Sequence, residues 1–364
     1  MFSIDEAKQS DYKYIPSKND SYILNETIVT VIIDCYYGID LVKQSIQSIL
    51  NQDYNNVELL IIDNGSEKIV SNYISRIHRE CKNVSLIVFK KNQFSWNDTQ
   101  ITVAICWNAG VIHAKGEIIG HLNYDDMLSS DCCSKMANLF LKNSDCVTAG
   151  PLPVSINIDG KINREFSDIL KSNNSRGIFI NGKELAVDFI SGSPKKYFSA
   201  PGGILFVKKE LIIKTGGFDR NPDITQIIKF SVYGDSGFDS TAKLFWRHHD
   251  GQLNRKINNK GIYSCNSFIN IIKNEKIVEI WKEVCSDKHV RMLKKYIRKE
   301  YYSRPVLTVI SSIRAKKYNV LFKVIWSILC KCPKILPRVL FYAFIEVSKM
   351  ISEKFIFIFR SSRD

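Results

Sequence analysis

The sequence lacks several patterns that would assign a function directly. Its ten cysteines contain no Cys-x-x-Cys pair and no Cys/His cluster with zinc-ligand spacing, which argues against a zinc finger or ribbon. No Gly-x-Gly-x-x-Gly follows the first apolar run, which disfavours a nicotinamide-dependent dehydrogenase. No stretch of 18 uncharged apolar residues occurs, and the first residues lack a basic-then-apolar pattern, so we expect neither a conventional membrane span nor a signal peptide. Scattered cysteines are instead typical of small core residues in a reducing cytosol.

An excess of either charge is missing from most of the chain. Residues 288–364 hold 18 Lys and Arg against 4 Asp and Glu, a net charge of +14, and residues 1–287 hold the remaining 33 of each sign (51 − 18 and 37 − 4). The neutral body offers no interleaved basic and aromatic platform, so nucleic-acid binding is disfavoured.

In the basic C-terminal part, apolar clusters such as 320–326 and 355–360 are interrupted by cations. This pattern is typical of basic amphipathic helices that lie on an anionic membrane surface. A helical cap on the rest of the chain, or a dimer interface, is the alternative.

Apolar runs of strand length alternate with helical patterns over the first 150 residues. Ile28–Ile33 is a continuous β-branched run, as expected for a strand buried on both faces, and Val57–Ile62, with Glu58 its one charged residue, is predicted as a second buried strand. The same reading predicts strands at 84–89, 117–122 and 146–149, and helices at 41–50, 71–81, 99–114 and 131–141. We therefore predict an α/β fold, a Rossmann-like and mostly parallel sheet with helices on both faces.

The second half of the chain is less regular. Residues 151–198 have no readable period, and 202–207 is predicted as a strand followed by a short helix. Ser236 and Asp239 have the spacing of a capping box, so we predict a helix over residues 235–247.

Polar side chains follow three of the predicted strands. Tyr36, Asp63 and Asp125 all stand at predicted carboxyl ends, where sheets of this class bind their ligands. Asp125 and Asp126 are adjacent carboxylates, which are costly to bury unless they are paired or bind a metal. A divalent cation that carries phosphate oxygens would suit them, whereas the plain alternative is a solvated loop that caps the next helix.

Five motifs, in order, resemble those of the family 2 glycosyltransferases, which have the glycosyltransferase A-type nucleotide-sugar fold. The resemblance runs from about Ile28 to Arg247, or 220 of 364 residues. Its parts are Thr30-Val31-Ile32-Ile33 with Ser45–Gln52, Glu58–Ser66, Asn108-Ala109-Gly110, Ala114–Ile119 with Asp125-Asp126, and Thr215-Gly216-Gly217-Phe218-Asp219.

The resemblance implies an inverting transfer of a sugar from a nucleoside diphosphate to an acceptor hydroxyl. Mn²⁺ or Mg²⁺ would neutralise the leaving diphosphate, with Asp125 and Asp126 as ligands. His249 is a further candidate ligand, although a packed imidazole in a polar turn is the alternative for it. Asp235 is the first candidate for the general base that activates the acceptor, and Asp239 the second. The residues expected at the nucleotide are Asp34, Tyr36, Asp63, Asn64, Asn108 and Asp125.

The chain also departs from the family pattern. Asn123 stands where the family usually has the first acid of its Asp-x-Asp motif, and Asn64 often corresponds to a second Asp, so the nucleotide base is not carried over. These changes leave open a degenerate nucleotide-sugar-binding scaffold without catalysis, against which the intact Asp125, Asp126 and Asp235 argue.

The predicted layout places an unpatterned extension before one catalytic domain and a basic tail after it. The expected partners are a nucleoside-diphosphate sugar of hexosyl or N-acetylhexosaminyl type, a glycan or lipid-linked acceptor, and an anionic membrane, with a homo-oligomer left open. We expect a cytoplasmic enzyme, peripheral on the inner membrane, in bacterial surface polysaccharide or lipid-linked glycan assembly. The predicted ranges are an extension at 1–26, a catalytic domain at 27–255 with a nucleotide-sugar half (27–150) and an acceptor half (151–255), a helical linker at 256–300 and membrane-associating helices at 301–364.

Overall fold

The computed structural model divides the chain into two compact units. The first comprises Met1–His249 with Asn274–Leu293, and the second comprises Asp250–Lys273 with Lys294–Asp364. The predicted domain ranges stay predictions, because compactness does not test what each range does. The structure describes residues 4–18, 22–23, 26–95, 101–165, 178–192, 206–219, 222–252, 275–314, 318–331, 333–345 and 348.

A mixed sheet forms the centre of the first unit, in the strand order β1-β4-β3-β2-β5-β10-β7-β11-β6, with β8 paired to β7 and β9 to β11. Its parallel part confirms the predicted Rossmann-like α/β fold. Every residue of β3 is buried, as predicted for a strand covered on both faces. The four parallel strands are β2 (Val29–Cys35), β3 (Val57–Asp63), β4 (Val84–Phe89) and β5 (Ile118–Asn123).

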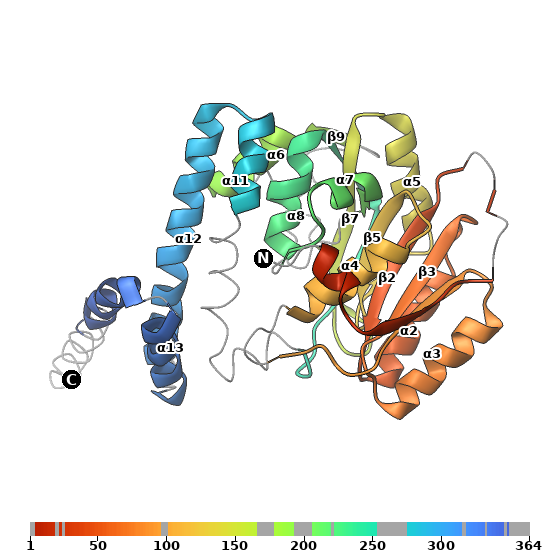
Figure 1. Ribbon diagram of the computed structural model, residues 1–364, viewed down its shortest axis with the longest axis horizontal. Coiled ribbons are helices and arrows are strands. Elements are labelled where there is room, and N and C mark those ends of the chain that lie inside the picture. Colours follow the sequence, from red (N-terminus) through yellow and green to blue (C-terminus); the bar gives the residue numbers. More distant parts are fainter. Residues whose placement is uncertain are drawn as a thin grey trace, which may run out of the picture. The chain divides into compact units, whose positions relative to one another are not determined.

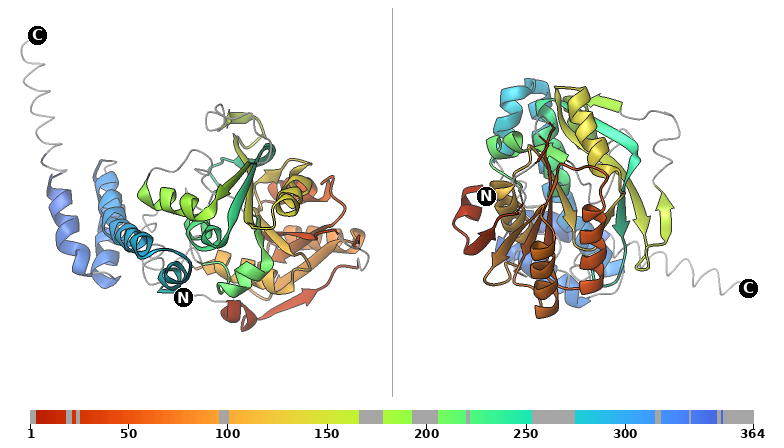
Figure 2. Two further views of the ribbon diagram at one scale, coloured as in Figure 1. Left: turned by 90° about the horizontal axis from the view of Figure 1, so that it is seen from above. Right: turned by 90° about the vertical axis from the view of Figure 1, so that its right-hand side faces the viewer.

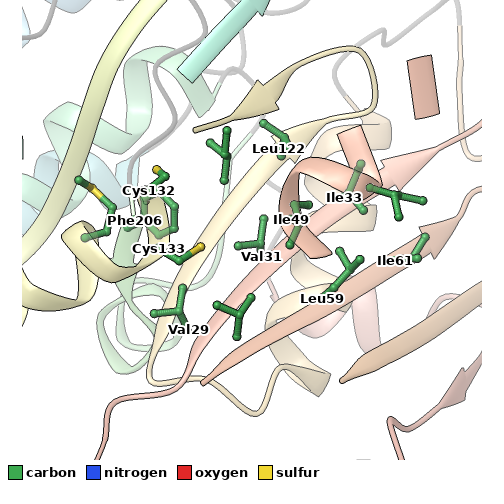
Figure 3. Packing of buried hydrophobic residues seen from close by; sticks show 14 of the residues in the cluster. Val29, Val31, Ile33, Ile49, Leu59, Ile61, Leu122, Cys132, Cys133 and Phe206 are labelled. Atoms are coloured by element: carbon green, nitrogen blue, oxygen red, sulfur yellow. The ribbon is translucent and has the colours of Figure 1, made fainter. Parts of the chain in front are cut away.

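Helices cover both faces of this sheet (Figures 1 and 2). One face packs on α2 (Ile39–Leu50), α3 (Lys68–Glu80) and α5 (Cys132–Lys142), and the other on α4 (Ile101–His113). The alternation of side chains along β2 sets this division, because Val31 and Ile33 join the first core and Ile32 joins the second. Figure 3 shows the first core, where Val31 and Ile33 lie among side chains of α2 and α5.

The predicted helix over residues 235–247 is wrong, since these residues form the long strand β11 (Asp235–Arg247). β11 runs parallel to β7 (Cys146–Ile156) and antiparallel to β9 (Ile178–Asn181) and β6 (Met127–Leu128). Pairing with three distant strands outweighs the local spacing that resembled a helix cap.

The remaining segments of the first unit extend or cover the sheet. The segment without a readable period, 151–198, contains the second half of β7, β8 (Ile162–Glu165), β9 and α6 (Gly182–Ser191). β10 (Phe206–Lys208) lies antiparallel between β5 and β7, while the start of the predicted strand at 202–207 lies outside the described residues. The N-terminal segment adds β1 to the sheet, antiparallel to β4. The other elements are α1 (Ile4–Lys8), β1 (Tyr12–Ile15), α7 (Lys209–Lys214), α8 (Pro222–Phe230), η2 (Ser231–Tyr233) and α11 (Glu275–Val284).

From Lys294 on, helices make up most of the described part of the second unit, which confirms the predicted helical C-terminal extension. α12 (Asp287–Arg314) leads into α13 (Tyr318–Lys331) and η3 (Pro333–Ile335), and residues 336–345 continue as helix. Within the described ranges, no helix is both long and apolar enough to cross a membrane. The apolar run at 355–360 lies outside the described residues.

Candidate functional site

The carboxyl ends of three parallel strands bring the predicted polar residues to one edge of the sheet. In the strand register, Asp34 of β2 lies opposite Asn123 of β5, and Cys35 lies opposite Asp63 of β3. The loops that follow these strands therefore start side by side, as expected for a ligand site on a sheet of this class.

The Asp125 and His249 side chains are joined by a hydrogen bond at this edge. Their Oδ2 and Nε2 atoms lie 3.0 Å apart, and only 9% of each side chain is exposed. They come from segments 124 residues apart, because β11 ends at Arg247 and delivers His249 beside the loop after β5. The structure thus joins two of the three residues that the sequence predicted as metal ligands.

Arg247 is a site residue that the sequence analysis missed. It is wholly buried, and its Nε donates to the carbonyl of Asp125 at 2.8 Å. Its guanidinium also donates to the carbonyl of Ile158 at 2.6 Å and to Gln44 Oε1 at 2.8 Å. The available signal was a cation directly after the apolar residues Leu244-Phe245-Trp246, two residues before His249. Arg247 ties the loop after β5 to α2 and to the segment after β7, and so fixes the backbone that carries Asp125.

Asp126 does not join the Asp125–His249 pair, and its predicted role as a metal ligand stays a prediction. Its Oδ1 accepts from the Arg247 backbone N–H at 2.9 Å and its Oδ2 from Asn123 Nδ2 at 2.8 Å. Burial, and then repulsion by Asp125, raises the pKa of Asp126 well above its usual range. Its carboxylate holds the loop together. Asn123 has a local role for the same reason, since an amide donates to the buried Asp126 where a carboxylate would repel it.

Asp34 and Tyr36 border the same edge. Trp107 Nε1 donates to Asp34 Oδ1 at 3.1 Å. Burial raises the pKa of Asp34, which the Trp107 hydrogen bond opposes and the charge of Asp125 reinforces. The Tyr36 ring is 42% exposed, and its edge meets Tyr37 at 5.7 Å between ring centroids. An exposed ring on a fixed aromatic neighbour suits stacking on a nucleoside base, as predicted for Tyr36.

Asp63 and Asn64 shape the loop after β3. Asp63 accepts from the Ser66 N–H at 2.8 Å and from Ser71 Oγ at 2.6 Å. Asn64 Oδ1 accepts from the Gln93 N–H at 2.9 Å. Both side chains are buried, and their predicted contacts with a nucleotide stay predictions.

Asn108 holds the glycine turn that precedes α8. Its Oδ1 accepts from the Phe218 N–H at 2.6 Å and its Nδ2 donates to the Phe218 carbonyl at 3.0 Å. Gly217 has a φ of 93°, and a Cβ there would lie 2.4 Å from Asn108 Oδ1. The buried amide is therefore engaged in packing, and a nucleotide contact by Asn108 stays a prediction.

Asp235, the first candidate for the general base, lies at the end of the sheet opposite Asp125, and its catalytic role stays a prediction. It pairs with Cys146, the first residue of β7, and accepts from Asn143 Nδ2 at 2.9 Å. Because β10 is antiparallel to both β5 and β7, these two strands run in the same direction. Asp235 thus stands with the amino ends of the strands, roughly 20 Å from Asp125 along the strand direction.

Asp239 stabilises a register shift in β11. Its Oδ1 accepts from the Thr241 N–H at 2.8 Å and from Thr241 Oγ1 at 2.6 Å, and the pairing with β7 shifts between Asp239 and Lys243. Such an irregularity in a strand needs a local acceptor for its unpaired backbone. These bonds give Asp239 a structural role, and a catalytic one stays a prediction.

The donor set fits a metal that arrives with its substrate. Within the described residues, no group of three or more His, Cys, Asp or Glu side chains could hold an ion. Asp125 and His249 supply one carboxylate and one imidazole, and Mg²⁺ sites often combine one or two carboxylates with substrate phosphates and water. The pair therefore suits a cation whose remaining ligands are diphosphate oxygens.

Comparisons with known proteins agree with this fold. Residues 30–193 match the family model "Glycosyl transferase family 2". An uncharacterized glycosyltransferase of Haemophilus influenzae is 32% identical over 127 residues, which are 35% of this chain and 48% of that protein. The hyaluronan synthase of Pasteurella multocida is 26% identical over 151 residues, which are 42% of this chain and 15% of that protein. The matched region therefore spans about half or less of these relatives.

A solved structure extends the likeness in fold. The crystal structure of S. aureus TarS 1–349 in complex with UDP-GlcNAc superimposes with a TM-score of 0.58 at 9% identity. The superposition covers 88% of this chain and 89% of that one.

Proposed function

We propose that this chain, whose residues 30–193 match the family 2 glycosyltransferase model, transfers a sugar from a nucleoside-diphosphate sugar to an acceptor hydroxyl with inversion. The observation that carries the proposal is the Asp125–His249 pair at the carboxyl ends of the parallel strands. That edge is where sheets of this class bind nucleotides. A neighbour of the same fold, solved in complex with UDP-GlcNAc, supports a nucleotide-sugar donor.

Each residue of the pair has a defined part in this proposal. Asp125 and His249 would hold Mn²⁺ or Mg²⁺, which would neutralise the charge on the leaving diphosphate. Arg247 keeps the Asp125 backbone in place through its Nε hydrogen bond. Tyr36 would stack on the base, while Asp34 and Asp63 would face the nucleoside.

We further propose a hexose or N-acetylhexosamine donor and a glycan or lipid-linked acceptor in bacterial surface polysaccharide assembly. The sugar nucleotide bound to TarS and the name of the Pasteurella relative support this class. The net charge of +14 over residues 288–364 supports a peripheral position on an anionic surface, which we place at the cytoplasmic face of the inner membrane.

A nucleotide-sugar-binding subunit without catalysis is the second candidate. It is favoured by Asn123 and by the absence of a three-ligand metal group within the described residues. The hydrogen bond from Asn123 to Asp126 weakens this second candidate, because it gives a structural reason for an amide in place of a carboxylate at position 123.

A thermal-shift panel with a transfer assay separates these functions. Nucleoside diphosphates and their sugars are added with and without Mn²⁺ to wild type, Asp125→Asn and the matched control Asp235→Asn. We expect Mn²⁺-dependent stabilisation in wild type and Asp235→Asn and its loss in Asp125→Asn. Release of nucleoside diphosphate in the presence of glycan acceptors then supports the enzyme. Stabilisation with no release for any acceptor supports the binding subunit, and no stabilisation by any nucleotide overturns both.

A further inference from the structure

The described helices of the second unit enclose a small apolar core of their own. On α13, Val324 and Ile328 point into this core, and Ile335 and Val339 enter it from the following segment. The members of the core, each at most 9% exposed, are Val306, Val309, Ile313, Val324, Ile328, Ile335 and Val339. One apolar face of α13 is therefore already covered by neighbouring helices.

A second apolar face of α13 is exposed. Phe322 is 71% exposed and Trp326 is 67% exposed, and Tyr318 and Leu329 extend the row at helical spacing. Val324 stands two residues after Phe322, about 200° around the helix, so the exposed row and the core row lie on opposite sides. Few soluble monomers leave such a row of large aromatic side chains uncovered.

The helix over residues 336–345 also exposes large apolar side chains. Phe344 is 72% exposed, and Leu340 and Phe341 lie on the same side of that helix. We name the aromatic face as the seven side chains of Tyr318, Phe322, Trp326, Leu329, Leu340, Phe341 and Phe344.

Cations predominate in the segment that carries the aromatic face, and the first acid, Glu346, follows it. Residues 318–345 contain four cations and no Asp or Glu. Lys323 and Lys334 are exposed. A second copy of this surface would bring like charges together, and the neutral residues 1–287 offer no excess of acid to match them. Aromatic rings favour the membrane–water interface, and the cations beside them complement anionic lipid headgroups.

We propose that the aromatic face lies in the interface of an anionic lipid bilayer, with α13 parallel to the membrane plane. The rings occupy the boundary between headgroups and acyl chains, and the lysines contact lipid phosphates. The cations and the short helices are consistent with an element that lies on the membrane rather than crossing it. The proposal deepens the membrane part of the proposed function, but it does not depend on the transfer reaction.

Vesicle sedimentation of the full-length chain tests the proposal. The probe is phosphatidylcholine vesicles with and without phosphatidylglycerol, at low and high salt. Wild type is expected to bind the anionic vesicles, with binding weakened by salt. The double variant Phe322→Ser/Trp326→Ser should bind about a hundredfold more weakly, since each buried aromatic ring contributes roughly tenfold. The matched control Leu141→Ser, an exposed leucine of the first unit on α5, should bind as wild type does.

A second readout locates the face within the bilayer. Lipids brominated near the headgroup should quench part of the tryptophan fluorescence of wild type. Trp326→Phe should lose that quenching while keeping vesicle binding, because it preserves an aromatic ring. Circular dichroism confirms that the exposed substitutions leave the fold intact.

Two outcomes overturn the proposal. Equal vesicle binding by wild type and the double variant is one. The other is a change in oligomeric mass of the double variant with vesicle binding unchanged, which assigns the face to a contact between copies. Failure of the proposed function would appear separately, as the absence of nucleotide-dependent stabilisation with vesicle binding intact.

Discussion

The two ends of the central sheet both hold buried carboxylates, and they differ in what those carboxylates contact. At the amino ends, Glu58 is wholly buried and accepts from Thr30 Oγ1, the Lys115 N–H and Ser85 Oγ at 2.6–2.7 Å. At the carboxyl ends, Asp125 pairs with His249, whose imidazole can exchange its bond to the carboxylate for a bond to a metal ion. Both ends therefore bury an acid, but of these two acids only Asp125 has a partner, His249, that could bind a metal ion instead.

A pocket at the amino ends makes the same point. Its volume is about 520 Å³, and its lining includes Lys115, Lys208 and Lys209. Each ammonium is already engaged, with Ser17 Oγ, the Ser144 carbonyl and the Ala114 carbonyl respectively. The pocket's lysines tie down chain segments, so the size of a pocket alone does not mark the functional end of this sheet.

Asp125→Asn should have the largest effect on activity. It removes the negative charge proposed to hold the metal, so the account predicts a loss of kcat/KM on the order of 10²–10³-fold. The melting temperature should stay near that of wild type, because an amide can still accept from His249. Nucleoside diphosphate release, followed by a coupled assay, measures the loss. A change below threefold would remove Asp125 from the mechanism.

Arg247→Lys tests the scaffold beneath the carboxyl-end site. A lysine cannot reproduce the forked bonds to Ile158, Gln44 and the Asp125 carbonyl, so unfolding free energy should fall by on the order of 3 kcal/mol. Activity should fall about 10–100-fold at temperatures where the variant is folded. Urea unfolding measures the first effect. Arg76→Lys, at an exposed position on α3, is the matched control and should change stability by less than about 0.5 kcal/mol. Equal losses in both variants would contradict the positioning role.

Glu58→Gln should separate stability from activity at the amino ends. Its amide places a donor where Thr30, Ser85 and the Lys115 N–H all donate, so stability should fall by about 1–3 kcal/mol. The kcat of the folded variant should stay within about twofold of wild type, since changes remote from a reacting centre leave transition-state binding intact. A large fall in kcat with little change in stability would reverse the comparison.

Asp235→Asn should have the smallest effect. The amide oxygen still accepts from Asn143, and the position is half-buried, so stability should change by less than about 0.5 kcal/mol. Initial rates at saturating donor should match wild type. An activity loss as large as that of Asp125→Asn would mean that the sequence motif, and not the strand end, marks the base.

Local patterns predicted the first half of the fold well. The runs at 28–33 and 57–62 became β2 and β3 because strands buried on both faces are made mostly of apolar residues, with Thr30 and Glu58 buried as a hydrogen-bonded pair. The strand β11 could not be predicted this way, since its partners β7 and β6 lie about 90 to 120 residues earlier in the chain. Contacts of that separation leave no local period in the sequence.

The candidate site shows the same limit. Adjacent acids at a strand end pointed to Asp125, but the division of labour between Asp125 and Asp126 depends on Arg247, more than 120 residues away. Asn108 fits a family motif, yet its amide binds the backbone of Phe218, 110 residues later. Residue type therefore pointed to the carboxyl ends of the strands, where the Asp125–His249 contact lies, and tertiary contacts decided which side chains remain for a ligand.

Electron spin-echo spectroscopy of bound Mn²⁺ tests the central claim most directly. Mn²⁺ is added to the full-length chain with the nucleoside diphosphate that stabilises it most. The account predicts a nitrogen coupling from His249 in wild type and in Asp235→Asn, and its loss in His249→Gln. Retention of that coupling in His249→Gln, or its loss in Asp235→Asn, would contradict a site at the carboxyl ends of the strands.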